Sequence, residues 1–362
     1  MLAAIAQIFD ETEQKCRNVV AQLPDGVYEA EASIDDDGLI RGEEVPIRVK
    51  IAIKGSDMTI DLSGCSAERK AAINSRTYAG ARVAYKALTG PLDPVNEGSF
   101  RALKVIIPEG NIMMARFPAP MSGWSAIVPT VVDTIVMALA KAMPDRVPAG
   151  HHGLLGGTVV FFGLDPKTKR RFVVQSIEGG GWGGRPFEDG ESATVSVCQG
   201  DVRNGSIEGI ELKCPVLIES RGLRQDSCGA GKHRGGLGLD VRVRNLVEGK
   251  WNFERARRSK RPPWGLWGGT AGEPSGNLLK LPGEKAFPLE RVAAMVVEDV
   301  AEGLISRQAA RKLYGVILRG NMSLDESATA RLRDRLRSTR KARSKKSSKL
   351  KPQKRPGLRK GR

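Results

Sequence analysis

The sequence is poor in the residues that build disulfide frameworks and metal clusters. It has five cysteines and three histidines in 362 residues, and no two cysteines form a CxxC pair. An odd number of widely spaced cysteines predicts neither a disulfide framework nor a zinc cluster. The histidines, His151, His152 and His233, are too few for a His-rich metal site built from this chain alone.

A long apolar run and a basic leader are also missing. The best candidate for a membrane span, residues 126–143, is interrupted by Pro129, Asp133 and Lys141. It therefore falls short of the ~20 apolar residues that a span requires. The short apolar stretch at the N-terminus meets acidic residues from Asp10 onward, which argues against a signal or transit peptide. We expect a cytoplasmic protein with no membrane segment.

Acidic residues are nearly absent from the end of the chain. Residues 330–362 hold 16 Lys or Arg and one acid, Asp334, and supply +15 of the formal net charge of +17. The segment 338–362 cannot bury enough apolar surface to offset its chain entropy, so we expect a disordered basic tail. It has no aromatic residue to stack on bases. Any binding of nucleic acid would therefore be weak, non-specific and driven by phosphate contacts.

The periodicity of apolar residues predicts an N-terminal α/β region over residues 1–149. Apolar residues recur at three- and four-residue steps from Ile5 to Leu23, which predicts an amphipathic helix. Alternation of apolar and polar residues over 47–53 and 58–62 predicts a β-hairpin with one solvent-exposed face. Further elements are expected at residues 77–89 (helix), 103–107 (strand) and 129–142 (helix).

Two more regions follow. From 150 to 285, short β-rich runs such as 158–162 and 172–177 alternate with glycine-dense loops. Residues 286–337 return to a helical pattern. The whole is predicted to be an α+β fold with mixed sheets, a glycine-rich β region and a small helical end.

The helical end carries recognisable cap signals. Ser306 is expected to cap a helix that Gly315 ends, and a short strand is expected at 316–318. Ser323 and Glu326 form a capping-box pattern that would open the last helix.

Three segments combine glycine with tryptophan or charged residues. They are residues 178–185, which hold five glycines around Trp182, residues 226–238 and residues 261–269. Glycine at such density lets the backbone approach a ligand or another backbone closely. Two interpretations of the first segment stay open: a binding loop, or a tight loop in which Trp182 fills a packing site. It is not a phosphate-binding Walker loop, because no GK[ST] ends it.

Taken in order along the chain, these and other segments resemble the hydantoinase B family, which includes N-methylhydantoinase B subunits, part of 5-oxoprolinase and the acetone carboxylase alpha subunit. The resemblance covers about residues 1–337. The segments that carry it are Leu23-Pro24-Asp25-Gly26, Asp61-Leu62-Ser63-Gly64, Asn96-Glu97-Gly98, Ile107-Pro108-Glu109-Gly110, the glycine loop at 179–184, Asp226-Ser227, Arg234-Gly235-Gly236 and Pro263-Trp264-Gly265.

The resemblance implies a subunit of an ATP-dependent enzyme that hydrolyses a cyclic amide, either a hydantoin or 5-oxoproline. A companion A-type subunit would use ATP and Mg²⁺, and this chain would work on the activated substrate without binding a cofactor by itself. Two alternatives stay open: a subunit of a ketone carboxylase, and a non-catalytic remnant or scaffold subunit.

Compared with the family, the chain begins well inside the usual register. The resemblance therefore implies that a segment with His- and Asp-containing metal-ligand motifs is missing, and that a divalent metal would bind only together with that segment. A separate chain is one expected source of it. Loss of a segment from a shared core would expose apolar surface, so the chain should dimerise, find a complementing chain or aggregate. His151 and His152 are given no ligand role, because adjacent side chains of an extended segment point apart.

Six residues are predicted to line the ligand or the subunit interface: Glu178, Arg185, Asp189, Asp226, Lys232 and Arg234. Arg234 is expected to hold a carboxylate or imide oxygen through two hydrogen bonds, with Asp226 holding its guanidinium. The alternative is that Asp226 caps a turn and Arg234 is a structural tie.

Overall fold

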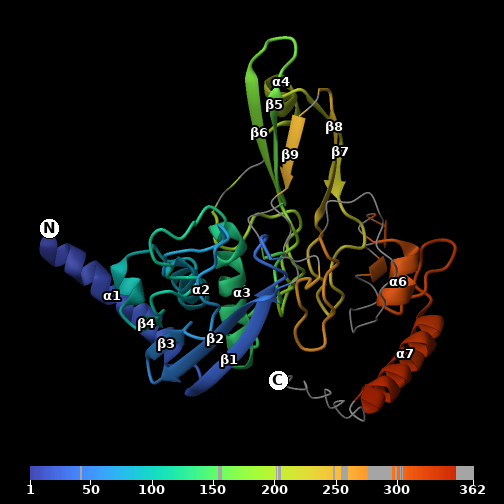
Figure 1. Ribbon diagram of the computed structural model, residues 1–362. Helices are drawn as coiled ribbons and strands as arrows, with labels where there is room; N and C mark the ends of the chain where they lie inside the picture. The colour runs from blue at the N-terminus through green and yellow to red at the C-terminus, as the bar shows by residue number, and fades with distance from the viewer. Residues whose placement is uncertain are drawn as a thin grey trace, which may run out of the picture. The chain divides into compact units, whose positions relative to one another are not determined.

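The computed structural model describes residues 1–40, 43–153, 157–200, 202, 205–247, 249–253, 260–275, 296–297, 300–301, 303 and 305–347. Helices and small mixed sheets follow one another along the chain, so the fold is of the α+β class, as predicted (Figure 1). The chain divides into two compact units, Met1–Gly283 and Glu284–Arg362. The finer regions expected from the sequence stay predictions.

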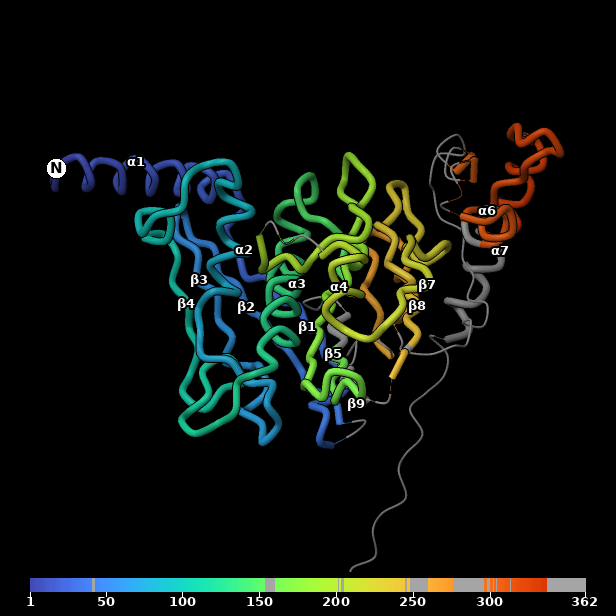
Figure 2. The backbone as a smooth tube through the Cα atoms, turned by 90° about the horizontal axis from the view of Figure 1, so that it is seen from above, coloured from blue at the N-terminus to red at the C-terminus, as the bar shows by residue number. Residues whose placement is uncertain are grey.

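The first unit begins with helix α1 (Leu2–Val20) and a four-stranded sheet. The strands β1 (Gly26–Ile34), β2 (Val45–Lys54), β3 (Asp57–Asp61) and β4 (Leu103–Ile106) lie side by side in that order (Figure 2). All pair antiparallel except β3 with β4, which are parallel. The predicted hairpin is confirmed as β2 and β3. It turns at Gly55, whose φ of +58° suits glycine.

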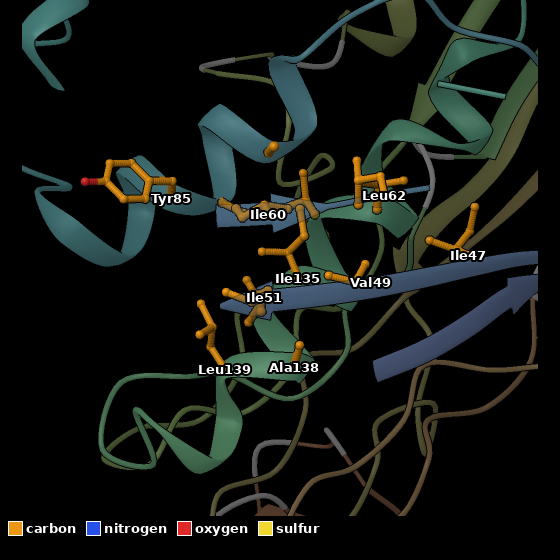
Figure 3. Packing of buried hydrophobic residues seen from close by; sticks show 14 of the residues in the cluster. Ile47, Val49, Ile51, Ile60, Leu62, Tyr85, Ile135, Ala138 and Leu139 are labelled. Atoms are coloured by element: carbon orange, nitrogen blue, oxygen red, sulfur yellow. The ribbon is translucent and has the colours of Figure 1, made fainter. Parts of the chain in front are cut away.

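The core of this unit lies between the sheet and two helices, α2 (Ala79–Thr89) and α3 (Val128–Ala138). Alternation along β2 buries Ile47, Val49 and Ile51 on one face and leaves the residues between them half-buried or exposed. Figure 3 shows Val49 and Ile51 beside Ile135 of α3. The helix predicted at residues 129–142 therefore packs on the sheet.

A longer window around α3, Trp124–Lys141, is the one stretch of the described chain that is long and apolar enough to cross a membrane. Within the protein 83% of that window is buried, and it includes two short 3₁₀ turns, Trp124–Ala126 and Leu139–Lys141. The window serves here as a core element.

The second half of this unit contains two small antiparallel sheets. One has the order β6 (Arg171–Glu178), β5 (Gly157–Leu164), β9 (Gly249–Phe253), and the other pairs β7 (Val216–Leu223) with β8 (Leu239–Asn245). A short helix, α4 (Ile207–Lys213), begins where Ser206 Oγ accepts a hydrogen bond from Gly209 N.

The second unit confirms one predicted cap and corrects another. Ser306 Oγ accepts a hydrogen bond from Ala309 N at 3.0 Å at the start of α6 (Arg307–Leu313). The next helix, α7 (Glu326–Ser347), is capped by Asp325, whose Oδ1 accepts from Ala328 N, so the predicted capping box with Ser323 is wrong. Asp325 is placed directly before the helix, where a carboxylate reaches the orphan N–H groups.

Two further expectations for this unit are not met. Within the predicted strand 316–318, only Leu318 makes a β-bridge, to Leu324. Residues 338–347 continue α7, although disorder was expected from 338 onward. Lys, Arg and Ala are good helix formers, so a helix already capped and nucleated can extend into a basic segment. Residues 348–362 lie outside the described residues.

Candidate functional site

The three glycine-dense segments come together in the first unit. The carbonyl oxygen of Trp182 accepts a hydrogen bond from Gly236 N at 2.8 Å, which joins the first segment to the second. The second reaches the third where Thr270 N donates to the carbonyl oxygen of Ala230 at 2.9 Å. We call residues 149–153, 179–194, 226–238 and 261–272 the glycine assembly.

Several glycines in the assembly are required by space. A Cβ on Gly181 would lie 2.0 Å from the carbonyl oxygen of Gly236, and one on Gly183 would lie 2.0 Å from that of Ala149. A Cβ on Gly236 would lie 1.7 Å from the carbonyl oxygen of Glu191. Backbone therefore approaches backbone too closely for any side chain. The many glycines thus allow segments of the backbone to lie against one another. This supports the interpretation in which Trp182 fills a packing site.

The assembly is anchored to α3 by a buried pair of polar side chains. His151 Nδ1 lies 2.5 Å from Asp133 Oδ1, and the two residues are 4% and 2% exposed. The His151 ring stands edge-on to Trp182, with ring centroids 4.8 Å apart and planes at 88°. Trp182 in turn donates from Nε1 to the carbonyl oxygen of Val195 at 2.7 Å. These contacts fix α3, His151 and the loop that contains Trp182 relative to one another.

A cysteine near this pair remains a neutral thiol. Burial raises the pKa of Cys198 above its ordinary value, and the hydrogen bond with Ser196 opposes that effect only in part. A thiol whose pKa is raised by burial is a weak nucleophile at neutral pH. Cys198 is therefore a packing residue against the core of the first unit.

Five of the six predicted site residues lie in the glycine assembly, and Arg185, Asp189 and Arg234 form ion pairs within it. Asp189 Oδ1 accepts a hydrogen bond from Arg234 N at 2.9 Å, and its Oδ2 lies 3.6 Å from Arg234 Nε. Arg185 forms an ion pair with Glu188, within the same loop. The Arg234 side chain is 11% exposed and also donates to the carbonyl oxygen of Gly235. Arg234 thus joins two glycine segments, as the structural alternative proposed.

The other three residues differ from these in their contacts, exposure and backbone conformation. Glu178 ends β6 and forms a bidentate ion pair with Arg221 of β7, with contacts of 2.7 Å and 2.9 Å. Lys232 is exposed. Asp226 lies in a turn with φ of +63°, an uncommon conformation for a residue other than glycine. A ligand-binding role for all six residues stays a prediction.

The Asp133–His151 pair was not predicted from the sequence. One signal was available, because Asp133 is the only charged residue in the apolar run 126–140. A buried acid needs a partner, and the nearest histidine follows 18 residues later.

Among the described residues, no group of three His, Cys, Asp or Glu side chains is arranged to hold a metal ion.

Comparison with known proteins identifies the chain. The family model described as hydantoinase B/oxoprolinase matches residues 1–305. The chain belongs to the hydantoinase B/oxoprolinase family. Most of its first unit, including the glycine assembly, is therefore family architecture.

Two curated relatives in this family are of bacterial origin. The putative D-/L-hydantoinase B-type subunit of Pseudomonas sp. (strain NS671) is 29% identical over 91% of this chain and 62% of its own length. The beta subunit of the caprolactamase of Pseudomonas jessenii is 28% identical over 90% of this chain and 63% of its own length. The chain thus spans about three fifths of the length of these relatives.

Two solved structures are similar to this chain in fold. The ATP-dependent caprolactamase from Pseudomonas jessenii superposes with a TM-score of 0.72 and 26% identity, covering 92% of this chain and 64% of that one. The nucleotide-free acetone carboxylase has a TM-score of 0.75 at 17% identity, covering 94% and 55%, and shows the shared fold alone.

We expect the close backbone contacts to make Gly181 intolerant of any side chain. Gly181→Ala places a methyl group 2.0 Å from a carbonyl oxygen that is itself fixed. The free energy of unfolding in urea should fall by roughly 3 kcal/mol or more, as for strained or overpacked sites. Gly200→Ala is the matched control, because nothing lies within 4 Å of its Cβ position. Equal stability of the two variants would contradict the argument.

We also expect the buried pair to contribute to stability. His151→Ala removes the ring partner of Asp133 and should lower the free energy of unfolding by roughly 3–5 kcal/mol. Asp133→Leu combined with His151→Leu should be less destabilising than His151→Ala, because no carboxylate is then left buried. Urea unfolding of both variants measures this. A double variant as unstable as the single one would show that the pair is not the cause.

Proposed function

We propose that this chain acts as the B-type subunit of an ATP-dependent enzyme that opens a cyclic amide, with a hydantoin or 5-oxoproline as substrate. The observation that carries the proposal is the family match over residues 1–305. The assembly of glycine segments within that match supports it, because close backbone contacts of this kind fix a loop in one conformation. We place the enzyme in the cytoplasm.

The chemistry explains why two subunits would be needed. An amide carbonyl is a poor electrophile. Transfer of the γ-phosphoryl group of ATP to the carbonyl oxygen, with release of ADP, would make the carbonyl carbon susceptible to attack by water. The A-type subunit would supply this step with ATP and Mg²⁺, and the B-type chain would hold the activated ring. Positioned N–H groups and cations then stabilise the negative charge that develops on oxygen.

Two other functions are favoured by specific observations. A carboxylase role is supported by the acetophenone carboxylase delta subunit of Aromatoleum aromaticum, which is 28% identical over 72% of this chain and 40% of its own length. A scaffold role is supported by apolar side chains that α1 leaves exposed, such as Leu2 at 83%.

Turnover with the partner decides between these functions. We expect ATP-dependent opening of hydantoin or 5-oxoproline when the chain is mixed with an A-type subunit, and none with either protein alone. Caprolactam, and acetophenone with bicarbonate, are assayed in parallel, with ADP or phosphate release and product as the readouts. Carboxylation without ring opening would select the carboxylase, and no turnover of any substrate would select the scaffold.

Arg234 tests whether the glycine assembly meets the substrate. If its guanidinium holds a substrate oxygen, Arg234→Ala should lower kcat/KM roughly 10–100-fold, and Arg234→Lys should recover little, because lysine lacks the two-pronged geometry. Lys167→Ala, at an exposed residue of the turn between β5 and β6, is the control and should keep full activity. Unfolding of each variant is measured in parallel. Unchanged turnover in Arg234→Ala would leave Arg234 as a structural tie only.

A further inference from the structure

Helix α7 (Glu326–Ser347) of the second unit is anchored near its start (Figure 1). Thr329 is 5% exposed, and its Oγ1 accepts a hydrogen bond from Ile317 N at 2.9 Å. One turn later, Arg333 Nε donates to the carbonyl oxygen of Tyr314, directly after α6, at 3.0 Å. These contacts fix the first half of the helix against the rest of the unit. They therefore set the direction in which its second half extends.

The second half of α7 is strongly basic. Residues 335–347 hold seven Lys or Arg and no acid. They span roughly 20 Å at the rise of an α-helix, so the helix carries about one positive charge for every 3 Å of its axis. Like charges at this density repel one another and oppose a regular helix. A partner that brings regularly spaced negative charge would relieve the repulsion and stabilise the helix.

The composition of this segment restricts the partner. After Leu336, the sequence of α7 has no aromatic residue and no apolar residue larger than Ala342. The buried centre of a protein–protein interface is depleted in charged residues and rich in aromatic ones. A helix that lies in a membrane surface needs an apolar face. A segment whose main feature is its cations fits a polyanion instead, such as the phosphate backbone of a nucleic acid duplex.

We propose that residues 335–347 of α7, the basic arm, bind double-stranded DNA through its phosphates, without reading the base sequence. B-form DNA carries one negative charge per ~1.7 Å of its axis. Its major groove, about 12 Å wide, admits an α-helix with its side chains. The major groove of an RNA duplex is deep and narrow, so a DNA duplex fits the arm better. The basic arm lies outside the family match over residues 1–305, and this proposal does not depend on the proposed function.

Binding of the full chain to a short labelled DNA duplex, followed by fluorescence anisotropy, tests the proposal. We expect the logarithm of the binding constant to fall with the logarithm of salt concentration with a slope of about −5, as for roughly six phosphate contacts. Glutamine at four cations of the basic arm keeps the helix propensity. It should weaken binding at low salt at least about tenfold and reduce the slope by about 3–4. The substitutions are Arg340→Gln, Lys341→Gln, Arg343→Gln and Lys345→Gln.

A matched control removes the same charge from another basic stretch. The turn that joins β5 to β6, together with the first residue of β6, carries four exposed cations: Lys167, Lys169, Arg170 and Arg171. Glutamine at all four lowers the net charge by the same amount and leaves the basic arm intact. This control variant should bind the duplex as tightly as the original chain. Circular dichroism checks that both variants are folded.

The helical form of the basic arm is tested separately. Ser338→Pro keeps every charge and interrupts the helix, because proline lacks an N–H donor and clashes with the preceding turn. We expect a smaller helix signal in circular dichroism and an affinity for the duplex roughly tenfold lower, since a disordered segment loses conformational entropy when it binds. An affinity equal to that of the original chain would show that the helix is not needed, and would overturn the proposal.

Other results also overturn it. Absence of binding, or equal binding by the glutamine variant of the basic arm, removes the arm as the DNA site. Equal weakening in the control variant assigns the binding to net charge alone. Tighter binding to an RNA duplex of the same sequence, or to vesicles that contain phosphatidylglycerol, assigns the arm to that partner instead. None of these measurements uses turnover, so an enzyme inactive on every amide would defeat the proposed function and leave this result unchanged.

Discussion

Backbone carbonyl oxygens occupy the space that a Cβ would need at several glycines, and the second half of the first unit depends on this constraint. Residues 179–194 and 226–238 make few regular strand pairings, yet their N–H and C=O groups form hydrogen bonds with one another at 2.8–3.0 Å. Removing the side chains lets irregular segments pair as closely as strands do, so buried backbone groups are satisfied without a sheet. Close backbone contacts thus hold the glycine assembly together, and a side chain at Gly181 or Gly236 would collide with a carbonyl oxygen.

Elements with strong periodicity could be predicted from the sequence. The β2–β3 hairpin and α3 were expected because their apolar residues repeat at steps of 2 and 3.6. One face of β2 is buried as its pattern predicts, whereas α3 is buried on nearly all sides. Glycine density indicated a close approach to a ligand or to another backbone segment, and the three segments make the second kind of contact. The strand β1 was not predicted. The side chains that point toward the core include the small residues Ala30 and Ala32. Because β1 is an edge strand that pairs only with β2, its alternation of apolar and polar residues is weak.

The site itself was predicted only in part, for reasons that lie in tertiary structure. Asp189 and Arg234 are 45 residues apart and meet because backbone contacts bring their segments together. Glu178 was placed in the same site because it is adjacent to the glycine loop, but its carboxylate turns to a strand that begins 38 residues later, at Val216. The pairing of Asp133 with His151 depends on how a loop crosses a helix, and spacing along the chain carries no information about such a crossing.

The ion pair between Glu178 and Arg221 joins two sheets that share no strand pairing among the described residues. Both side chains are mostly shielded from water, at 12% and 15% exposed, so the pair is stiff and only weakly screened by salt. A displacement of either sheet at this point would therefore have to break the ion pair or carry the other sheet with it.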